Sequence, residues 1–220
     1  MFVEPFVIVM AFVPLIGYLL VLGWIRISGR AVVTTGARDT AALALAISGF
    51  IVVGPAELFF PNAAATAFGP IVWLPLLVFY GLIVLLICLT VPAKLVVYGR
   101  GPMELFQSLS NVSKLIDPEA IGDETNVQVT LPTYGIHLRL DGYRGIDHAQ
   151  VVAFEPNVSP AFWNDLLGKL RDEVSGLPAP NPRRGFLMMT VAAALILLLL
   201  WIGIKNQERV VDGFRDWLWR

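Results

Sequence analysis

Four long apolar runs and one long polar block dominate the pattern of hydrophobic and polar positions along the chain. Three runs precede the block and the fourth follows it. The runs cover residues 6–24, 41–59, 71–91 and 186–204. Each is close to the roughly 20 residues that a helix needs to cross a hydrocarbon core. The pattern predicts a membrane protein with four transmembrane helices and an inserted polar domain.

Within the polar block, short segments alternate between strand and helix periodicity. A helix is expected to open at Gly101-Pro102, and a second helix to start with Ser159 as its cap and Pro160 at its first position. Strands are expected at residues 94–98, 126–131, 136–140 and 150–155. The resulting βαβββα order predicts an α+β domain, a two-layer sandwich with both helices on one face of the sheet.

These patterns divide the chain into five parts. A three-helix transmembrane unit is expected at residues 1–92, and the soluble α+β domain at 93–176. A proline-rich linker at 177–185 leads to the fourth transmembrane helix at 186–204, and an amphipathic interfacial tail at 205–220 follows.

The tail has apolar residues at helical spacing, with charged residues on the opposite face. We expect it to lie at the membrane interface or to dock against a partner subunit. The residues expected to carry that contact are Phe214, Trp217, Leu218 and Trp219.

Composition supports the membrane class and excludes several functions. The chain is 56% hydrophobic and 15% charged, whereas soluble domains carry about 25% charge. The net charge of −1 argues against a nucleic-acid partner. A single cysteine, Cys88, permits neither a disulfide framework nor a thiolate metal cluster. No nucleotide-binding or hydrolase motif is present, so neither a cofactor nor a metal is expected.

Basic residues near the helix ends predict the orientation. A topology with the first loop and the polar block in the cytoplasm, and both termini outside, collects basic residues on the cytoplasmic side. The tail opposes this assignment, because it also carries four basic residues. The residues collected inside are Arg26, Arg30, Arg38, Lys94, Arg100, Arg183 and Arg184, which could also contact anionic lipid headgroups.

Features inside the first three runs leave a role in transport open. Each run contains a proline, Pro14, Pro55 or Pro75, which is expected to bend its helix. Glycines at several positions are expected to let the helices approach closely. Glu57 is the one acidic residue in any run, and an ionisable group in lipid is a candidate for a proton or cation site. Glu57 also lies near the end of its run, where interfacial water can solvate it.

The richest polar loop is Asp141–His148. It contains Asp141, Arg144, Asp147 and His148, and an aspartate–histidine pair can perform acid–base chemistry. Adjacent loop residues without a further ligand at a defined spacing are a weak signal for a catalytic or metal site. His137 and Arg139 are expected on the solvent face of their strand. The acidic stretch 117–124 lacks the ligand spacing of a calcium loop and is interpreted as a solvated connection.

Three functions are compatible with these observations. The first is a non-catalytic accessory or scaffold subunit in the lipid bilayer, whose soluble domain binds another membrane or cytoplasmic protein. The second is a transporter component that uses Glu57. The third, and least favoured, is a membrane-bound enzyme that uses the Asp141–His148 loop.

Overall fold

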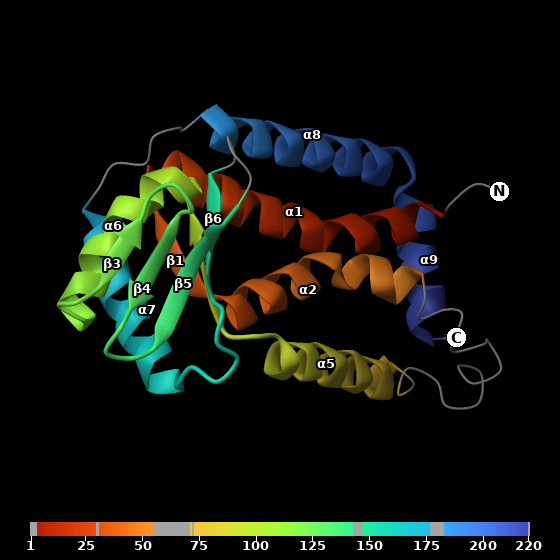
Figure 1. Cartoon of the computed structure of the whole chain (residues 1–220). Helices are drawn as coiled ribbons and strands as arrows, with labels where there is room; N and C mark the ends of the chain where they lie inside the picture. The colour runs from red at the N-terminus through yellow and green to blue at the C-terminus, as the bar shows by residue number, and fades with distance from the viewer. Residues whose placement is uncertain are drawn as a thin grey trace. The chain divides into compact units, whose positions relative to one another are not determined.

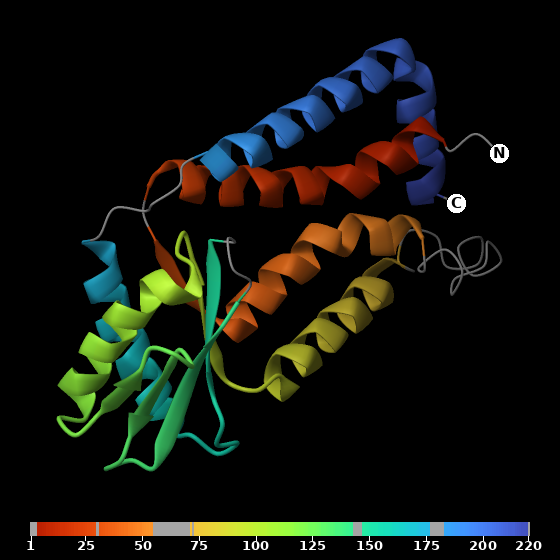
Figure 2. The same cartoon turned by 45° about the horizontal axis from the view of Figure 1, so that its top comes forward.

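The structure is a computed structural model that describes residues 4–29, 31–54, 71, 73–142, 147–176 and 183–219. For residues 73, 183–184 and 217–219 it describes the backbone alone. The chain is mostly helical, with a small antiparallel sheet (Figures 1 and 2). It divides into two compact units. The first consists of Met1–Leu22, Thr40–Leu89 and Leu187–Arg220, and the second of Gly23–Asp39 and Thr90–Phe186.

Three helices among the described residues are long and apolar enough to cross a membrane. They lie in α1 (Pro5–Ile27), α2 (Gly36–Val53) and α8 (Arg183–Lys205). Helix α5 (Trp73–Thr90), which corresponds to the third apolar run, counts as a shorter apolar helix because its fully described stretch is Leu74–Thr90. The structure therefore establishes three candidate spans and one shorter apolar helix. Helix α9 (Gln207–Trp219) follows α8.

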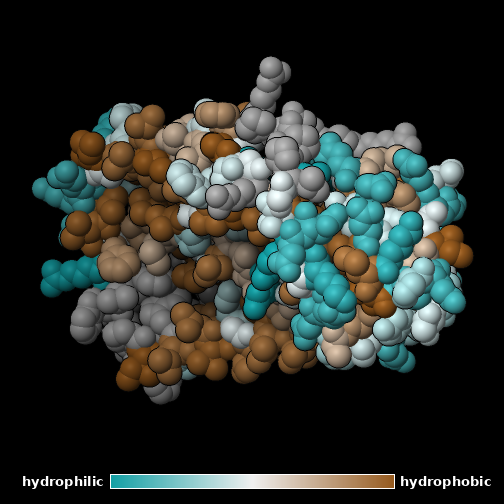
Figure 3. All heavy atoms as spheres, turned by 90° about the vertical axis from the view of Figure 1, so that its left-hand side faces the viewer, coloured by the Kyte–Doolittle hydropathy of each residue, from teal (hydrophilic) through white to brown (hydrophobic). Residues whose placement is uncertain are grey.

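Large hydrophobic side chains remain exposed on these apolar helices. Only 6% of the apolar window of α8 is buried within the chain. The space-filling view shows extensive hydrophobic areas on the visible face (Figure 3). Such areas far exceed what a soluble monomer normally exposes, and lipid is the environment that accommodates them.

The prolines are placed differently from the expectation of three bent helices. Pro14 lies inside α1, as expected. Pro75 lies in the first turn of α5, where its missing N–H removes no helical hydrogen bond. Helix α2 ends at Val53, and Pro55 falls outside the described residues. Of the three, only Pro14 interrupts a described helix.

Within the first unit, α2 meets α1 at Gly49. A Cβ at Gly49 would lie 2.3 Å from the carbonyl oxygen of Met10, so only glycine permits this approach. Nearby, the rings of Phe12 and Phe50 pack edge to face with centroids 5.1 Å apart. In contrast, a Cβ at Gly17 would meet nothing within 4 Å. The close approach of α2 to α1 therefore depends on Gly49 and not on Gly17.

Two further contacts join elements of the first unit. The Tyr80 hydroxyl on α5 donates a hydrogen bond of 2.6 Å to the carbonyl oxygen of Ala44 on α2. On α9, a Cβ at Gly213 would lie 2.4 Å from the ring of Phe6 in α1. Helix α9 thus packs on its own chain through Gly213 and leaves Val211 and Phe214 exposed.

The second unit is built on a six-stranded antiparallel sheet with the order β1-β2-β6-β5-β4-β3. Helices α6 (Pro102–Ile116) and α7 (Pro160–Ser175) pack against one face. The strands are β1 (Val32–Thr35), β2 (Lys94–Tyr98), β3 (Ile121–Asp123), β4 (Gln128–Leu131), β5 (Ile136–Asp141) and β6 (His148–Ala153).

Two strands of this sheet were not expected from the sequence. The predicted strands correspond to β2, β4, β5 and β6, but β1 and β3 extend the sheet at its two edges. Strand β1 comes from the connection between α1 and α2. This connection was expected to be a loop within the transmembrane unit. Strand β3 has three residues, all exposed, so it lacks the alternation that marks a half-buried strand. The βαβββα order was therefore incomplete.

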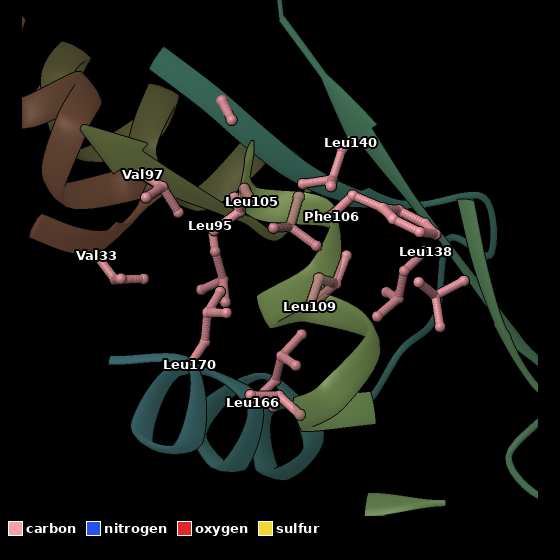
Figure 4. Packing of buried hydrophobic residues seen from close by; sticks show 14 of the residues in the cluster. Val33, Leu95, Val97, Leu105, Phe106, Leu109, Leu138, Leu140, Leu166 and Leu170 are labelled. Carbon is pink, nitrogen blue, oxygen red and sulfur yellow. The ribbon is translucent and has the colours of Figure 1, made fainter. Parts of the chain in front are cut away.

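The core between sheet and helices uses the side chains that periodicity selects (Figure 4). Leu95 and Val97 from β2 face Leu105 and Leu109 from α6, and all four are at most 1% exposed. Leu115 has the helical spacing of a core position in α6, but it is exposed. Helix α7 begins as expected, with the Ser159 hydroxyl accepting a 3.2 Å hydrogen bond from the Phe162 N–H.

Asp117 is buried and organises the end of α6, contrary to the interpretation of residues 117–124 as solvated. Its carboxylate accepts hydrogen bonds from the N–H of Glu119 (3.1 Å) and from both the N–H (2.9 Å) and the hydroxyl (2.8 Å) of Thr133. Burial raises the pKa of Asp117, but these hydrogen bonds outweigh it and hold the pKa below its ordinary value. The ionised carboxylate therefore ties α6 to the β4–β5 turn.

The close contact at Gly49 leads to a stability prediction. Gly49→Ala places a methyl group against the α1 backbone, so we expect a loss of about 1–3 kcal/mol, typical of overpacking. Gly81→Ala is the matched control, because a Cβ there meets nothing within 4 Å. Thermal unfolding of both variants in the same detergent measures the difference. Equal midpoints for the two variants would contradict the packing.

Candidate functional site

The face of the sheet opposite α6 and α7 carries a row of polar side chains. The strand register places Tyr98 opposite His148, and Val96 opposite Gln150. Because side chains alternate across a strand, Lys94, Tyr98, His148 and Gln150 share this face. Three of these four residues, Lys94, Tyr98 and His148, are titratable.

A groove of about 670 Å³ lies at this face. Its polar side chains come from three adjacent strands, and its end is formed by the β3–β4 turn. The groove is lined by Thr125, Asn126, Gln128, Arg139, Leu140, Asp141, Gly142, His148 and Gln150. It therefore presents amides, one cation, one carboxylate and one imidazole.

The groups in and beside the groove are held by short polar contacts. The Arg139 Nε lies 2.6 Å from an oxygen of Asp141. The Lys94 ammonium donates a 3.1 Å hydrogen bond to the side-chain oxygen of Gln150. At the β3–β4 turn, Val127 has a φ of 54°, an uncommon conformation for a β-branched residue. The strained backbone of Val127 therefore lies beside the groove.

One end of the polar row joins the sheet to α2. The Tyr98 hydroxyl donates a hydrogen bond to the carboxylate of Asp39, in the first turn of α2. The rings of Tyr98 and His148 lie with centroids 5.3 Å apart. Tyr98 thus stands between the carboxylate of Asp39 and the imidazole of His148.

His148 is half-buried, and its environment favours the neutral imidazole. Burial lowers its pKa, and the nearby charges modify that effect: Asp39 raises the pKa, while Arg26 and Lys94 lower it. The net result is a pKa below the ordinary value for histidine. At neutral pH His148 is therefore a neutral hydrogen-bonding group.

This arrangement offers polar contacts to a ligand. Asp39 contacts the Tyr98 hydroxyl, so it does not orient the imidazole as a catalytic carboxylate would. Within the described residues, no group of three or more His, Cys, Asp or Glu side chains is arranged to hold a metal ion. The groove offers donors and acceptors to a polar ligand.

The structure brings together part of the polar loop that the sequence singled out. Asp141 and His148 both line the groove. Asp147 is buried, and its carbonyl oxygen accepts a 3.0 Å hydrogen bond from the N–H of Gly99. Arg144 and the intramembrane candidate Glu57 both fall outside the described residues.

The predicted interfacial tail forms a helix, α9. Phe214 is exposed, whereas for Trp217, Leu218 and Trp219 the structure describes the backbone alone. His137 is exposed as expected, and its Nδ1 lies 2.6 Å from the Glu155 carboxylate.

Sequence reasoning missed Asp39 and Tyr98 as members of a site, and it named Lys94 only as one of the basic residues near the membrane. Asp39 is nearly 60 positions from Tyr98 in the chain and reaches it because β1 pairs with β2. The available signal was the run Val32-Val33-Thr34-Thr35, four β-branched residues that favour a strand.

A second hollow of about 630 Å³ lies between the β4–β5 turn and the start of α7. Tyr134 and Phe162 line it with aromatic surface. The Glu155 carboxylate in this hollow already accepts a hydrogen bond from the backbone N–H of His137 and contacts its ring. It therefore offers fewer free polar groups than the groove on the opposite face of the sheet.

Comparisons with protein-family models, curated protein sequences and solved structures found no match.

The electrostatics of His148 can be tested directly. We expect Asp39→Asn to lower the pKa of His148 further, because it removes the negative charge that favours imidazolium. Titration of the ring signals by NMR measures this, and the two histidines are distinguished with His137→Gln. Asp165→Asn is the control, since this exposed carboxylate pairs with Lys169 on α7. An unchanged or raised pKa in Asp39→Asn would contradict the geometry.

Proposed function

We propose that this protein is a non-catalytic membrane protein, an accessory or scaffold subunit whose soluble domain binds a partner protein. The observation that carries the proposal is the polar groove on the face of the sheet opposite α6 and α7. One face of the sheet is closed by a dry core, while the other presents hydrogen-bonding groups from three strands. A protein partner with complementary polar groups fits such a surface.

The groups in the groove can exchange their present contacts for contacts with a partner. The Arg139–Asp141 pair has both side chains about half exposed, and such pairs contribute only about 0–1 kcal/mol. The amides of Gln128 and Gln150 each offer both donors and acceptors. Binding therefore costs little in lost internal interactions.

The proposed membrane arrangement has four crossings. Helix α5 has 18 residues, which at about 1.5 Å per residue gives roughly 27 Å, close to the hydrocarbon thickness. The second unit contains the end of α1, the start of α2, the segment after α5 and the residue Gly185 at the start of α8. A Cβ at Gly185 would lie 2.7 Å from the Ile27 side chain, so the end of α1 and the start of α8 are in contact. This supports a layout in which the end of α1, the start of α2, the end of α5 and the start of α8 lie on the same side of the membrane.

The topology has a direct test. In the proposed arrangement the soluble domain is cytoplasmic and both termini are outside, as the basic residues favour. Reporter fusions after Ala65 and after Arg220 should both report an outside location. A fusion after Lys114, within the soluble domain, should report the cytoplasm. A cytoplasmic signal after Arg220 would overturn the four-crossing arrangement.

The groove can be tested by reversing one charge. Arg139→Glu places a second carboxylate beside Asp141, so we expect it to abolish co-purification of a partner in mild detergent. The exposed location of Arg139 keeps the cost to folding small. Lys114→Glu, an exposed position on α6, is the matched control and should retain the partner. Native mass analysis provides the readout. If native mass analysis shows that the unmodified protein purifies without any partner, this result would count against the scaffold function.

A membrane-bound enzyme is the second candidate, and one observation favours it. Asp141 and His148 line the same groove, and a neutral imidazole can accept a proton from a bound substrate. Asp147, the neighbouring acid in the sequence, is buried and does not line the groove. An intact biological function in His148→Gln would exclude this alternative.

A further inference from the structure

A hollow with apolar walls lies within the first unit, and residues of α1, α8 and α9 line it. Its volume is about 450 Å³. Helix α8 runs beside α1, and α9 turns back toward the start of α1 (Figures 1 and 2). There α9 contacts α1, since a Cβ at Gly213 would lie 2.4 Å from the Phe6 ring. We call this hollow the α1–α8 groove, and all its lining residues belong to the first unit.

Each long wall of the groove is one face of a helix. The α1 wall follows i, i+4, i+7 spacing, and the α8 wall follows i, i+3, i+4, i+7, i+8 spacing. The two walls consist of Val9, Val13 and Ile16, and of Ile196, Leu199, Leu200, Gly203 and Ile204. The side chains leave the space between the helices open, because Val13, Leu200 and Ile204 are 54%, 55% and 70% exposed. The groove is therefore an apolar surface that its own unit does not cover.

The position of the groove points to an apolar occupant. Helices α1 and α8 are both candidate membrane spans, so a groove between them opens to the hydrocarbon of the bilayer. Side chains that face a void lose the dispersion contacts that a filling group would supply. Only 6% of the apolar window of α8 is buried within the chain. An occupant of the groove would supply packing that α8 otherwise lacks.

The width of the groove favours a hydrocarbon chain over a partner helix. The α8 wall extends from Ile196 to Ile204, about 12 Å at the helical rise, which gives a mean cross-section of about 40 Å². A helix with its side chains is about 10–12 Å wide, so its cross-section is at least about 80 Å². Membrane helices also approach one another through small residues, and Gly203 is the one small residue among the described residues that line the groove.

One end of the groove carries a polar group. Gln207, the first residue of α9, lines this end together with Val210. Because α9 follows the end of a candidate span, Gln207 lies at the depth of the lipid headgroups. A partner helix that crosses the bilayer would have to continue past this level, where α9 packs on α1. A lipid has its polar part at this level, and its ester carbonyl is an acceptor for the amide N–H of Gln207.

We propose that the α1–α8 groove binds one acyl chain of a membrane phospholipid, and that the Gln207 amide donates a hydrogen bond to an ester carbonyl of the same lipid. The chain fills the space between α1 and α8 and packs against both walls. The site belongs to the first unit, so it does not depend on the binding of a partner protein by the second unit.

The test fills the groove and counts lipids. The full chain in non-ionic detergent is mixed with phosphatidylcholine, and native mass spectrometry measures how many lipid molecules each chain retains. A Cβ at Gly203 meets nothing within 4 Å, so Gly203→Leu adds a side chain to the groove without displacing the backbone. We expect this variant to retain one lipid fewer than the unmodified chain. Val13→Phe fills the groove from the α1 wall and gives the same result if Gly203→Leu does not fold.

Gly81→Leu is the matched control. It adds the same side chain to an exposed glycine of α5 that does not line the groove, so the number of retained lipids should stay the same. An equal loss in Gly203→Leu and Gly81→Leu would overturn the site, because any apolar surface would then hold the lipid. Unchanged retention in folded Gly203→Leu and Val13→Phe would overturn it too. So would a lipid-free dimer of the unmodified chain that Gly203→Leu dissociates, since a helix would then occupy the groove.

A second arm tests the polar end of the groove. Two phosphatidylcholines with chains of equal length are compared, one with ester and one with ether linkages. The ether lipid lacks the carbonyl acceptor, so we expect the unmodified chain to retain the ester lipid about fivefold better, as for one hydrogen bond. Gln207→Leu should abolish this preference while the groove still binds the chain. Equal retention of the two lipids by the unmodified chain would contradict the role of Gln207.

Discussion

The pairing of β1 with β2 is the constraint on which the second unit depends. Strand β1 comes from the short connection between α1 and α2, and β2 follows α5 directly, so this ladder joins the ends of three apolar helices to the sheet. Val33 becomes buried in the pairing, which contributes roughly 1.5–3 kcal/mol. The same pairing carries Asp39 to Tyr98. Without it, the polar row would lose its contact with Asp39.

The two faces of the sheet differ in their chemistry. One face is closed by α6 and α7 with aliphatic side chains that exclude water. The other brings together charged and amide groups in partial burial, where electrostatic interactions are stronger than in water and unpaired groups are costly. The hydrogen bond from the Tyr98 hydroxyl to the Asp39 carboxylate shows how the fold satisfies such groups.

The sequence predicted the elements with strong periodicity and missed those without it. Helices α6 and α7 begin where Pro102 and Ser159 predicted them, because proline and a capping hydroxyl act locally. Strand β3 has no buried residue, and Val127 adopts a left-handed turn that its β-branched side chain does not favour. Both depend on contacts with β4 and β5, which no local pattern encodes. For the same reason Asp141 and His148 could be named as candidates, while Asp39 and Tyr98 could not.

The amino-acid sequence by itself determined the membrane class and the alternation of core positions, because hydrophobic transfer and backbone periodicity act on each segment separately. Only the tertiary structure decided which glycine permits helix contact, since the distance from Gly49 to Met10 is set by two helices that pack together. It likewise decided that the first connection forms a strand and that Asp39 and His148 both contact Tyr98. These results arise from contacts between segments that are distant in the chain. The free energy of such a contact depends on both segments together, so neither segment predicts it alone.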